Sequence, residues 1–189
     1  TPTETPEERL LSIARAISEA EKVEDRNDWL ERFYNLMASL KWLPNSPSIA
    51  NAGKPGKGSL SACFTDSPLD TMESILQVQS EWGLIEKWGG GVGANFSMIR
   101  PKGSSITTTH GQALGPVAVM KMYSFNAKQI TQGSFRLGAH MGTLDVSHPD
   151  IQEFIHAKDN DNTLENFNIS VLVGDDFISA IEAGKEWNL

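Results

Sequence analysis

Apolar residues recur along this chain in two alternating patterns. Stretches with apolar residues three and four positions apart predict helices, and short, nearly continuous apolar runs between them are typical of buried strands. A helix is expected to begin near residue 5, with further helices near 28–40, 70–88, 114–132, 148–155 and 175–184, and strands near 60–65, 95–99, 139–146 and 166–173. After a helical N-terminal segment over residues 1–42, strands and helices therefore alternate. This alternation predicts an α/β fold with a parallel sheet and outer helices.

Proline and glycine mark the segments between these elements. Residues 43–48 hold two prolines and are expected to be extended. Residues 89–93 hold four glycines, which allow close backbone approach to a ligand and predict a glycine floor beneath it. These glycines follow a helix and precede a strand, the reverse of a dinucleotide-binding fingerprint. Asp70 is expected to be the N-cap of the next helix, with Glu73 completing a capping box.

The charge balance restricts the classes of partner. The 189 residues hold 16 Lys and Arg against 24 Asp and Glu, a net charge of -8. This excludes a broad basic surface for duplex nucleic acid or an anionic membrane, and no apolar run reaches the ~20 residues of a membrane span. A phosphate would have to be bound locally. Arg100 and Lys102 begin a polar loop over residues 100–111 and form the best candidate anion site.

Cys63 is the only cysteine, and it lies in the apolar run 60–65. A single cysteine cannot form an internal disulfide, and no cluster of His and Cys predicts a metal site. Together with the polar, acidic start of the chain, this favours a reducing compartment, and we expect a cytoplasmic protein. A lone cysteine is commonly a small buried apolar residue, but this one alone could perform thiol chemistry.

A colinear series of short motifs spans most of the chain. The segments are residues 43–48 (LPNSPS), 51–53 (NAG), 60–64 (LSACF), 70–75 (DTMESI), 89–93 (GGGVG), 100–103 (RPKG), 111–116 (GQALGP), 132–134 (QGS), 148–151 (HPDI) and 166–171 (NFNISV), with Arg136, Gly138 and Ala139. Combined, these motifs resemble the large catalytic chain of ribonucleotide reductases, and they are most similar to the adenosylcobalamin-dependent class II enzymes.

The resemblance implies a fold and a chemistry. The fold is a ten-stranded α/β barrel of two five-stranded halves, of which residues 43–189 would form the first half. Cys63 would be one of two cysteines that reduce a ribonucleotide and become a disulfide, which an external dithiol such as thioredoxin reduces again. The second cysteine and the radical-forming residues would belong to the other half. We therefore expect a fragment or split-gene product that works with a complementary C-terminal half-barrel chain.

The resemblance also implies two nucleotide sites. Positions matching the substrate site are Ser46, Ser61, Ala62, Gly89, Gly90 and Gly91. Positions matching the site for a deoxynucleotide or ATP effector are Asp70, Arg100, Lys102, Gln132, Gly133, Ser134 and Arg136, with Phe135 and Leu137 where class II relatives often carry arginines. The helix that follows Asp70 would pack against a second copy in a homodimer.

Two alternatives stay open at this point. The chain could be a non-catalytic nucleotide-binding or assembly module, or part of a class I, iron-dependent reductase. The substrate could be a diphosphate or a triphosphate. Turnover that depends on Cys63 separates the enzyme from the module, and activation by adenosylcobalamin separates the two reductase classes.

Overall fold

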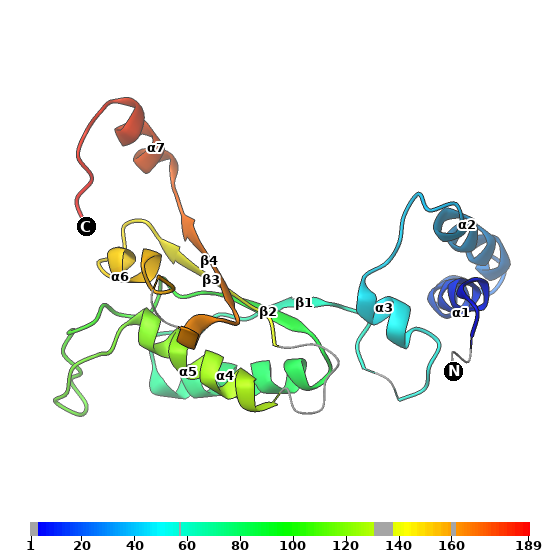
Figure 1. Cartoon of the computed structure of the whole chain (residues 1–189), viewed down its shortest axis with the longest axis horizontal. Coiled ribbons are helices and arrows are strands. Elements are labelled where there is room, and N and C mark those ends of the chain that lie inside the picture. The colour runs from blue at the N-terminus through cyan, green and yellow to red at the C-terminus, as the bar shows by residue number, and fades with distance from the viewer. Residues whose placement is uncertain (1–3, 57, 131–137, 160–161) are drawn as a thin grey trace. The chain divides into compact units, whose positions relative to one another are not determined.

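The computed structural model describes residues 4–56, 58–130, 138–159 and 162–189 (Figure 1). The chain divides into two compact units, Thr1–Ala62 and Cys63–Leu189. The first unit holds α1 (Pro6–Ser18), α2 (Arg26–Ala38) and α3 (Ser46–Asn51). Its core is formed by Ile13, Ala14, Met37 and Ala52. Among the described residues of both units, no helix is long and apolar enough to cross a membrane.

The extended conformation predicted for residues 43–48 is wrong, because α3 begins at Ser46. The side chain of Asn45 accepts a hydrogen bond from the Ser48 N–H at 2.9 Å, and a proline lies in the first turn of α3. A side-chain cap and a proline at this position start a helix, since the first N–H groups have no partner within it.

The second unit is a parallel sheet with helices, as the alternating pattern predicts. Its strands are β1 (Cys63–Thr65), β2 (Gly91–Asn95), β3 (His140–Asp145) and β4 (Phe167–Leu172), in that order across the sheet. The connecting and final helices are α4 (Met72–Lys87), α5 (Pro116–Ile130), α6 (Ile151–Ile155), the 3₁₀ turn η2 (Asn162–Leu164) and α7 (Asp175–Glu182). The described residues form four parallel strands rather than five, which fits part of an α/β barrel.

The glycine-rich segment is itself a strand, so the strand predicted at 95–99 is wrong. Gly91 pairs with Cys63 on one edge of β2, and Val92 pairs with His140 on the other. Backbone pairing on both edges outweighs the low strand propensity of glycine. The chain after Asn95 turns instead, with the Ile99 N–H donating to the Phe96 carbonyl at 3.0 Å.

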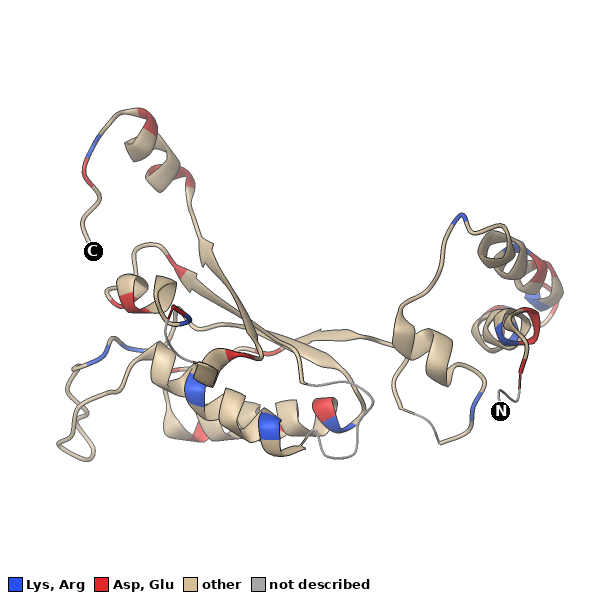
Figure 2. Ribbon diagram, in the orientation of Figure 1, with Lys and Arg blue, Asp and Glu red and all other residues tan. Residues whose placement is uncertain are grey.

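The two faces of the sheet differ in character. Phe64, Val92, Leu144 and Phe167 alternate onto the face that packs with α4 and α5 in the main hydrophobic core. We call the opposite side the thiol face; it carries Cys63, Thr65, Gly91, Gly93, Asn95, Met141, Thr143, Asp145, Asn168, Ser170 and Leu172. Cys63 and Thr65 are exposed, which corrects the expectation of a buried strand at 60–65. Asp145 is the single Asp, Glu, Lys or Arg of the four strands (Figure 2).

Candidate functional site

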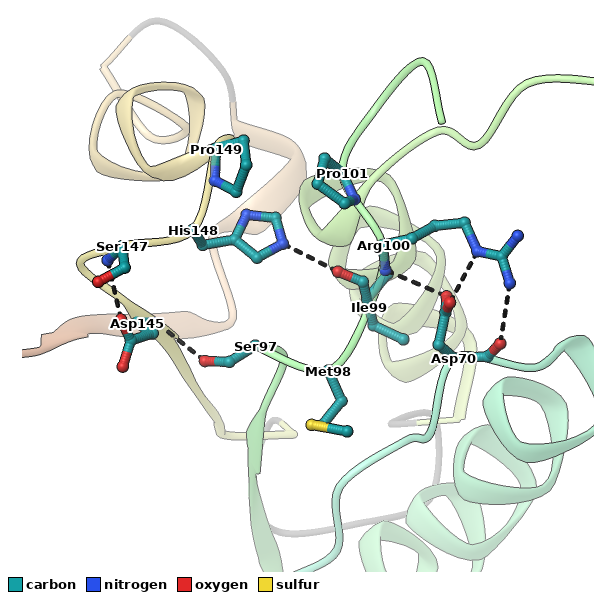
Figure 3. Close-up of a pocket in the computed structure, with 10 residues that line it drawn as sticks. All are labelled: Asp70, Ser97, Met98, Ile99, Arg100, Pro101, Asp145, Ser147, His148 and Pro149. Carbon is teal, nitrogen blue, oxygen red and sulfur yellow. Dashed lines mark hydrogen bonds and ion pairs between the residues drawn. The ribbon is translucent and has the colours of Figure 1, made fainter. Parts of the chain in front are cut away.

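A pocket of about 540 Å³ lies at the carboxyl ends of β2 and β3. Ligands of parallel α/β sheets commonly bind at this edge, where the loops after the strands meet. Figure 3 shows the lining residues, which come from the segment before α4, the segment after β2, and the end of β3 with the segment after it: Asp70, Ser97, Met98, Ile99, Arg100, Pro101, Asp145, Ser147, His148 and Pro149. The pocket thus unites two residues predicted for effector binding, Asp70 and Arg100.

Asp70 and Arg100 form an ion pair on one wall of the pocket. The Asp70 carboxylate accepts from the Arg100 backbone N–H at 3.1 Å and from its Nε–H at 2.7 Å. Asp70 is therefore not the N-cap of α4, and the predicted capping box with Glu73 is wrong. Thr71 caps the helix instead, because its side chain accepts from the Ser74 N–H at 3.2 Å. The carboxylate of Asp70 orients the guanidinium at the mouth of the pocket.

Two carboxylates hold the start of the loop that follows Arg100: Asp150, directly before α6, and Glu153, within α6. The Lys102 backbone N–H donates to Asp150 at 2.8 Å, and its Nζ donates to Glu153 at 2.9 Å. The bond to Glu153 raises the pKa of Lys102. Both cations of the predicted anion site are thus paired with carboxylates of this chain, so an incoming phosphate would compete with Asp70 and Glu153 for them.

His148 lines the pocket and connects two of its segments by hydrogen bonds. It was not predicted as a site residue. Its Nε2–H donates to the Ile99 carbonyl at 2.8 Å, and its Nδ1 accepts from the Asp150 N–H at 3.0 Å. Because both ring nitrogens are occupied, this buried histidine ties the turn after β3 to the segment after β2 rather than acting as a base. The sequence signal was its place in the HPDI motif, directly after a strand.

Cys63 lies at the other end of the sheet from this pocket, since it is the first residue of β1. Gly91 faces it on the neighbouring strand. Gly90 fills a narrow space between two side chains: a Cβ there would lie 2.6 Å from Ile85 Cγ2 and 2.9 Å from Phe64 Cε2. Gly90 thus faces the helix-covered side of the sheet, whereas Gly91 lies beside Cys63 and leaves the amino edge of the thiol face without a side chain there.

Comparison with known proteins agrees with this arrangement. The profile described as "Ribonucleotide reductase, barrel domain" matches residues 61–189, and "Ribonucleotide reductase, all-alpha domain" matches residues 1–57. The chain belongs to the ribonucleotide reductase family.

Three curated relatives cover most of the chain. A "Vitamin B12-dependent ribonucleoside-diphosphate reductase" of Thermoplasma acidophilum is 46% identical over 82% of this chain and 20% of its own length. A protein of the same name from Mycobacterium tuberculosis is 38% identical over 96% of the chain and 27% of its own length. A "Ribonucleoside-diphosphate reductase subunit alpha" of Synechocystis sp. is 33% identical over 100% of the chain and 25% of its own length. The chain thus spans 20–27% of these relatives.

The remaining predicted site residues of this family member fall in three places. Ser46 begins α3, and Ser61 and Ala62 directly precede Cys63, so all three belong to the first unit. Gly89 follows the C-terminus of α4 and has a positive φ of 80°. Gln132, Gly133, Ser134 and Arg136, with Phe135 and Leu137, lie outside the described residues. The structure thus brings together Cys63 with Gly91, and Asp70 with Arg100.

A carboxyl pair follows β1 within the second unit. Burial and a hydrogen bond to Glu81 raise the pKa of Asp66, while hydrogen bonds from Gln77 and Asp66 lower the pKa of Glu81. Burial, with Asp66 nearby, also raises the pKa of Tyr123, whose hydroxyl donates to the Ile75 carbonyl at 2.7 Å.

We expect Asp66→Asn to stabilise the second unit at pH 7. Since folding raises the pKa of Asp66, this carboxyl keeps its proton to a higher pH in the folded state, and its own contribution to stability falls as the pH rises above 3.8. An asparagine donates to Glu81 at every pH. The gain should be below about 0.5 kcal/mol because solvent screens the pair, or about 1–2 °C in Tm. Thermal unfolding at pH 7 and below pH 4 measures it; an equal gain at both would contradict this account.

Among the described residues, no group of three or more His, Cys, Asp or Glu side chains is placed to hold a metal ion.

Proposed function

We propose that this chain is the N-terminal part of a class II ribonucleoside-diphosphate reductase, with residues 43–189 forming the first half of its barrel. The observation that carries the proposal is the position of Cys63, exposed on a face of the sheet that the helices leave open and opposite Gly91 on the next strand. The relatives named vitamin B12-dependent diphosphate reductases support the class and the diphosphate substrate.

The proposed chemistry assigns Cys63 the role of a reductant. The ribose loses its 2′-hydroxyl as water and gains hydrogen at C2′. Two thiols, Cys63 and a second cysteine in the complementary half-barrel, supply two electrons and two protons and become a disulfide. An external dithiol such as thioredoxin then reduces the disulfide by exchange. A compartment that keeps such dithiols reduced is the cytoplasm, where we place the enzyme.

The glycines beside Cys63 form the proposed substrate floor. A backbone surface without a Cβ at Gly91 lets a ribose approach the thiol. The resemblance alone assigns Ser46, Ser61 and Ala62, which belong to the first unit, to substrate binding. The thiol face and the open edges of the sheet would be covered by the complementary half-barrel, since an open edge leaves backbone donors unpaired.

The pocket at the opposite edge is the proposed effector site. Its volume of about 540 Å³ suits a nucleotide. Asp70 would accept from the sugar hydroxyls of a deoxynucleotide or ATP, while Arg100 and Lys102 approach its phosphates. Gln132, Gly133, Ser134 and Arg136 would couple the effector base to the substrate, as the resemblance implies.

An exposed apolar surface on α4 supports a homodimer beside this site. Met72, Leu76, Leu84 and Trp88 are 63%, 49%, 62% and 54% exposed, although they lie on or next to one helix. Exposed apolar residues gathered on one element commonly mark an interface. We therefore propose that two copies pack through α4.

Leu84→Asp should dissociate this dimer. Burying a leucine contributes roughly 1.5–3 kcal/mol, and a two-fold interface loses it twice, so the dimer Kd should rise by at least about a hundredfold. Sedimentation of the complete enzyme measures the change. Leu114→Asp is the matched control, because Leu114 is 73% exposed but precedes α5. Equal dissociation by both variants, or by neither, would exclude α4 as the interface.

The cofactor proposed for the complete enzyme is adenosylcobalamin, which would supply the radical. Neither of two pockets among the described residues is large enough to enclose it. The pocket of about 540 Å³ and a second one of about 450 Å³ in the first unit fall within the roughly 300–1,000 Å³ of drug-sized ligand sites. A corrin with its nucleotide tail is much larger than such ligands. We therefore assign its contacts to the complementary half.

Reconstitution tests the proposed function. The chain combined with its complementary half-barrel should convert ribonucleoside diphosphates to deoxyribonucleotides only when adenosylcobalamin and a dithiol are both present. Activity with an iron-dependent radical subunit in place of adenosylcobalamin would assign the chain to class I. Effector binding without turnover under either condition would favour the non-catalytic nucleotide-binding module.

A further inference from the structure

A buried histidine and a buried glutamate meet on the helix-covered side of the sheet, outside both nucleotide sites. His140, the first residue of β3, and Glu86, in the last turn of α4, are 2% and 6% exposed. The Nε2–H of His140 donates to the Glu86 carboxylate. His140 is enclosed by Trp82 and Phe167, with ring centroids at 4.8 and 4.6 Å. A polar pair here requires an explanation, since the surrounding core is aromatic and apolar.

Stability alone explains the pair poorly. Replacing a buried ion pair with apolar side chains of similar volume is often neutral or stabilising, whereas a directional bond fixes the register of packed elements. The His140 Nδ1 is buried and has no hydrogen-bond partner among the described residues. The orientation of the ring thus rests on the bond to Glu86 and on the two aromatic neighbours.

The strand that needs its register fixed is β2. It reads Gly-Val-Gly-Ala-Asn and presents no side chain at Gly91 and Gly93, so only Val92 and Ala94, on the buried face, specify its register by packing. The bond between His140 and Glu86 spans β2, because it joins the helix before this strand to the strand after it. The main chain at Gly138 also lies against the carboxylate: a Cβ there would be 2.8 Å from Glu86 Oε1.

Backbone bonds connect this pair to the cysteine. The Gly89 N–H donates to the Glu86 carbonyl at 2.8 Å, and the Gly90 N–H donates to the Ile85 carbonyl at 3.2 Å. On the β3 side, the Val92 N–H donates to the Ala139 carbonyl at 3.0 Å. Gly91, between these bonds, pairs with Cys63.

We propose that Glu86 and His140 are positioning residues that hold the glycine floor, Gly89–Gly91, in place beside Cys63. The pair fixes the last turn of α4 against the start of β3. Because the backbone of Gly89 and Gly90 is hydrogen-bonded to that turn, it determines where Gly91 lies. The inference rests on the proposed function only for its effect on turnover. Its effect on the glycine backbone is a property of the second unit itself.

Two replacements of the pair have opposite expected results. Glu86→Gln keeps an oxygen that accepts from His140, so amide hydrogen exchange at Gly89–Val92 should stay within about twofold of wild type. The double variant Glu86→Leu/His140→Phe has apolar side chains of similar volume but loses the directional hydrogen bond between the two positions. It should retain the Tm of the wild type. Amide hydrogen exchange at Gly89–Val92 should become about 10- to 100-fold faster, and kcat should fall about 10- to 100-fold, which is the cost of a small misplacement.

Tyr123→Phe is the matched control. It removes another buried hydrogen bond of the same core, from Tyr123 to the Ile75 carbonyl, and should lower Tm without changing exchange at Gly89–Val92. Wild-type exchange in the folded double variant, or fast exchange in Glu86→Gln, would overturn the proposal. If the double variant does not fold, Glu86→Gln decides alone. If wild type shows no turnover in the reconstituted enzyme, the proposed function fails, and the exchange rates still test the positioning role.

Discussion

Replacing Cys63 with serine should abolish dithiol-dependent turnover of the reconstituted enzyme. A hydroxyl cannot form the disulfide with the second cysteine, so the two electrons have no source, and kcat should fall by at least about a thousandfold. Effector binding should stay within about twofold of wild type, because Cys63 begins β1 whereas the pocket lies at the carboxyl ends of β2 and β3. Product formation from labelled ribonucleoside diphosphate and calorimetry with a deoxynucleotide measure the two effects.

Thr65→Ser is the matched control for this prediction. Thr65 lies on the same face of β1, two residues from Cys63, and is also exposed. The shorter hydroxyl side chain should leave turnover nearly unchanged. Sustained turnover of Cys63→Ser with dithiol would refute the redox role of Cys63, whereas equal losses in both variants would indicate damage to the sheet edge.

The order of elements was predictable because apolar periodicity reports which side of an element is buried. The helices near residues 70–88 and 114–132 and the strands near 139–146 and 166–173 follow that pattern closely. The helical repeat also places Glu86 in line with the buried Val78 and Trp82, eight and four residues earlier. A carboxylate on an apolar face needs a partner, but no local pattern identifies His140, which lies 54 residues away.

The strand at Gly91–Asn95 was not predictable by the same reasoning. Its conformation depends on pairing with Cys63 on one edge and His140 on the other, contacts that are distant in sequence. The capping role of Thr71 is similar: Asp70 is a good N-cap by type, but its carboxylate is engaged by Arg100, 30 residues away. A local sequence signal mispredicts the structure where a tertiary contact uses the atoms that the local hydrogen bond would need. The redox role proposed for Cys63 needed the family resemblance, because a single cysteine forms no spaced motif with a second cysteine in the chain.

Replacing Asp70 with alanine should weaken effector binding and leave unregulated reduction measurable. The variant loses the proposed acceptor for the sugar hydroxyls and also releases Arg100, whose Nε–H is held by Asp70 at 2.7 Å. Hydrogen bonds to charged groups contribute roughly 1.5–3 kcal/mol, so the Kd of the deoxynucleotide should rise about 10- to 100-fold. Calorimetry with a deoxynucleoside triphosphate measures the change.

Asp145→Asn is the control within the same pocket. Asp145 accepts from the Ser147 N–H at 2.8 Å through Oδ1, and asparagine keeps that oxygen, so the variant lowers the negative charge of the pocket without changing its turn. If loss of charge alone governed affinity, both variants would bind the anionic effector more tightly. The assignment of Asp70 requires the opposite result for Asp70→Ala. An unchanged or lower Kd in that variant would show that freeing Arg100 for the phosphates outweighs any contact of Asp70 with the sugar.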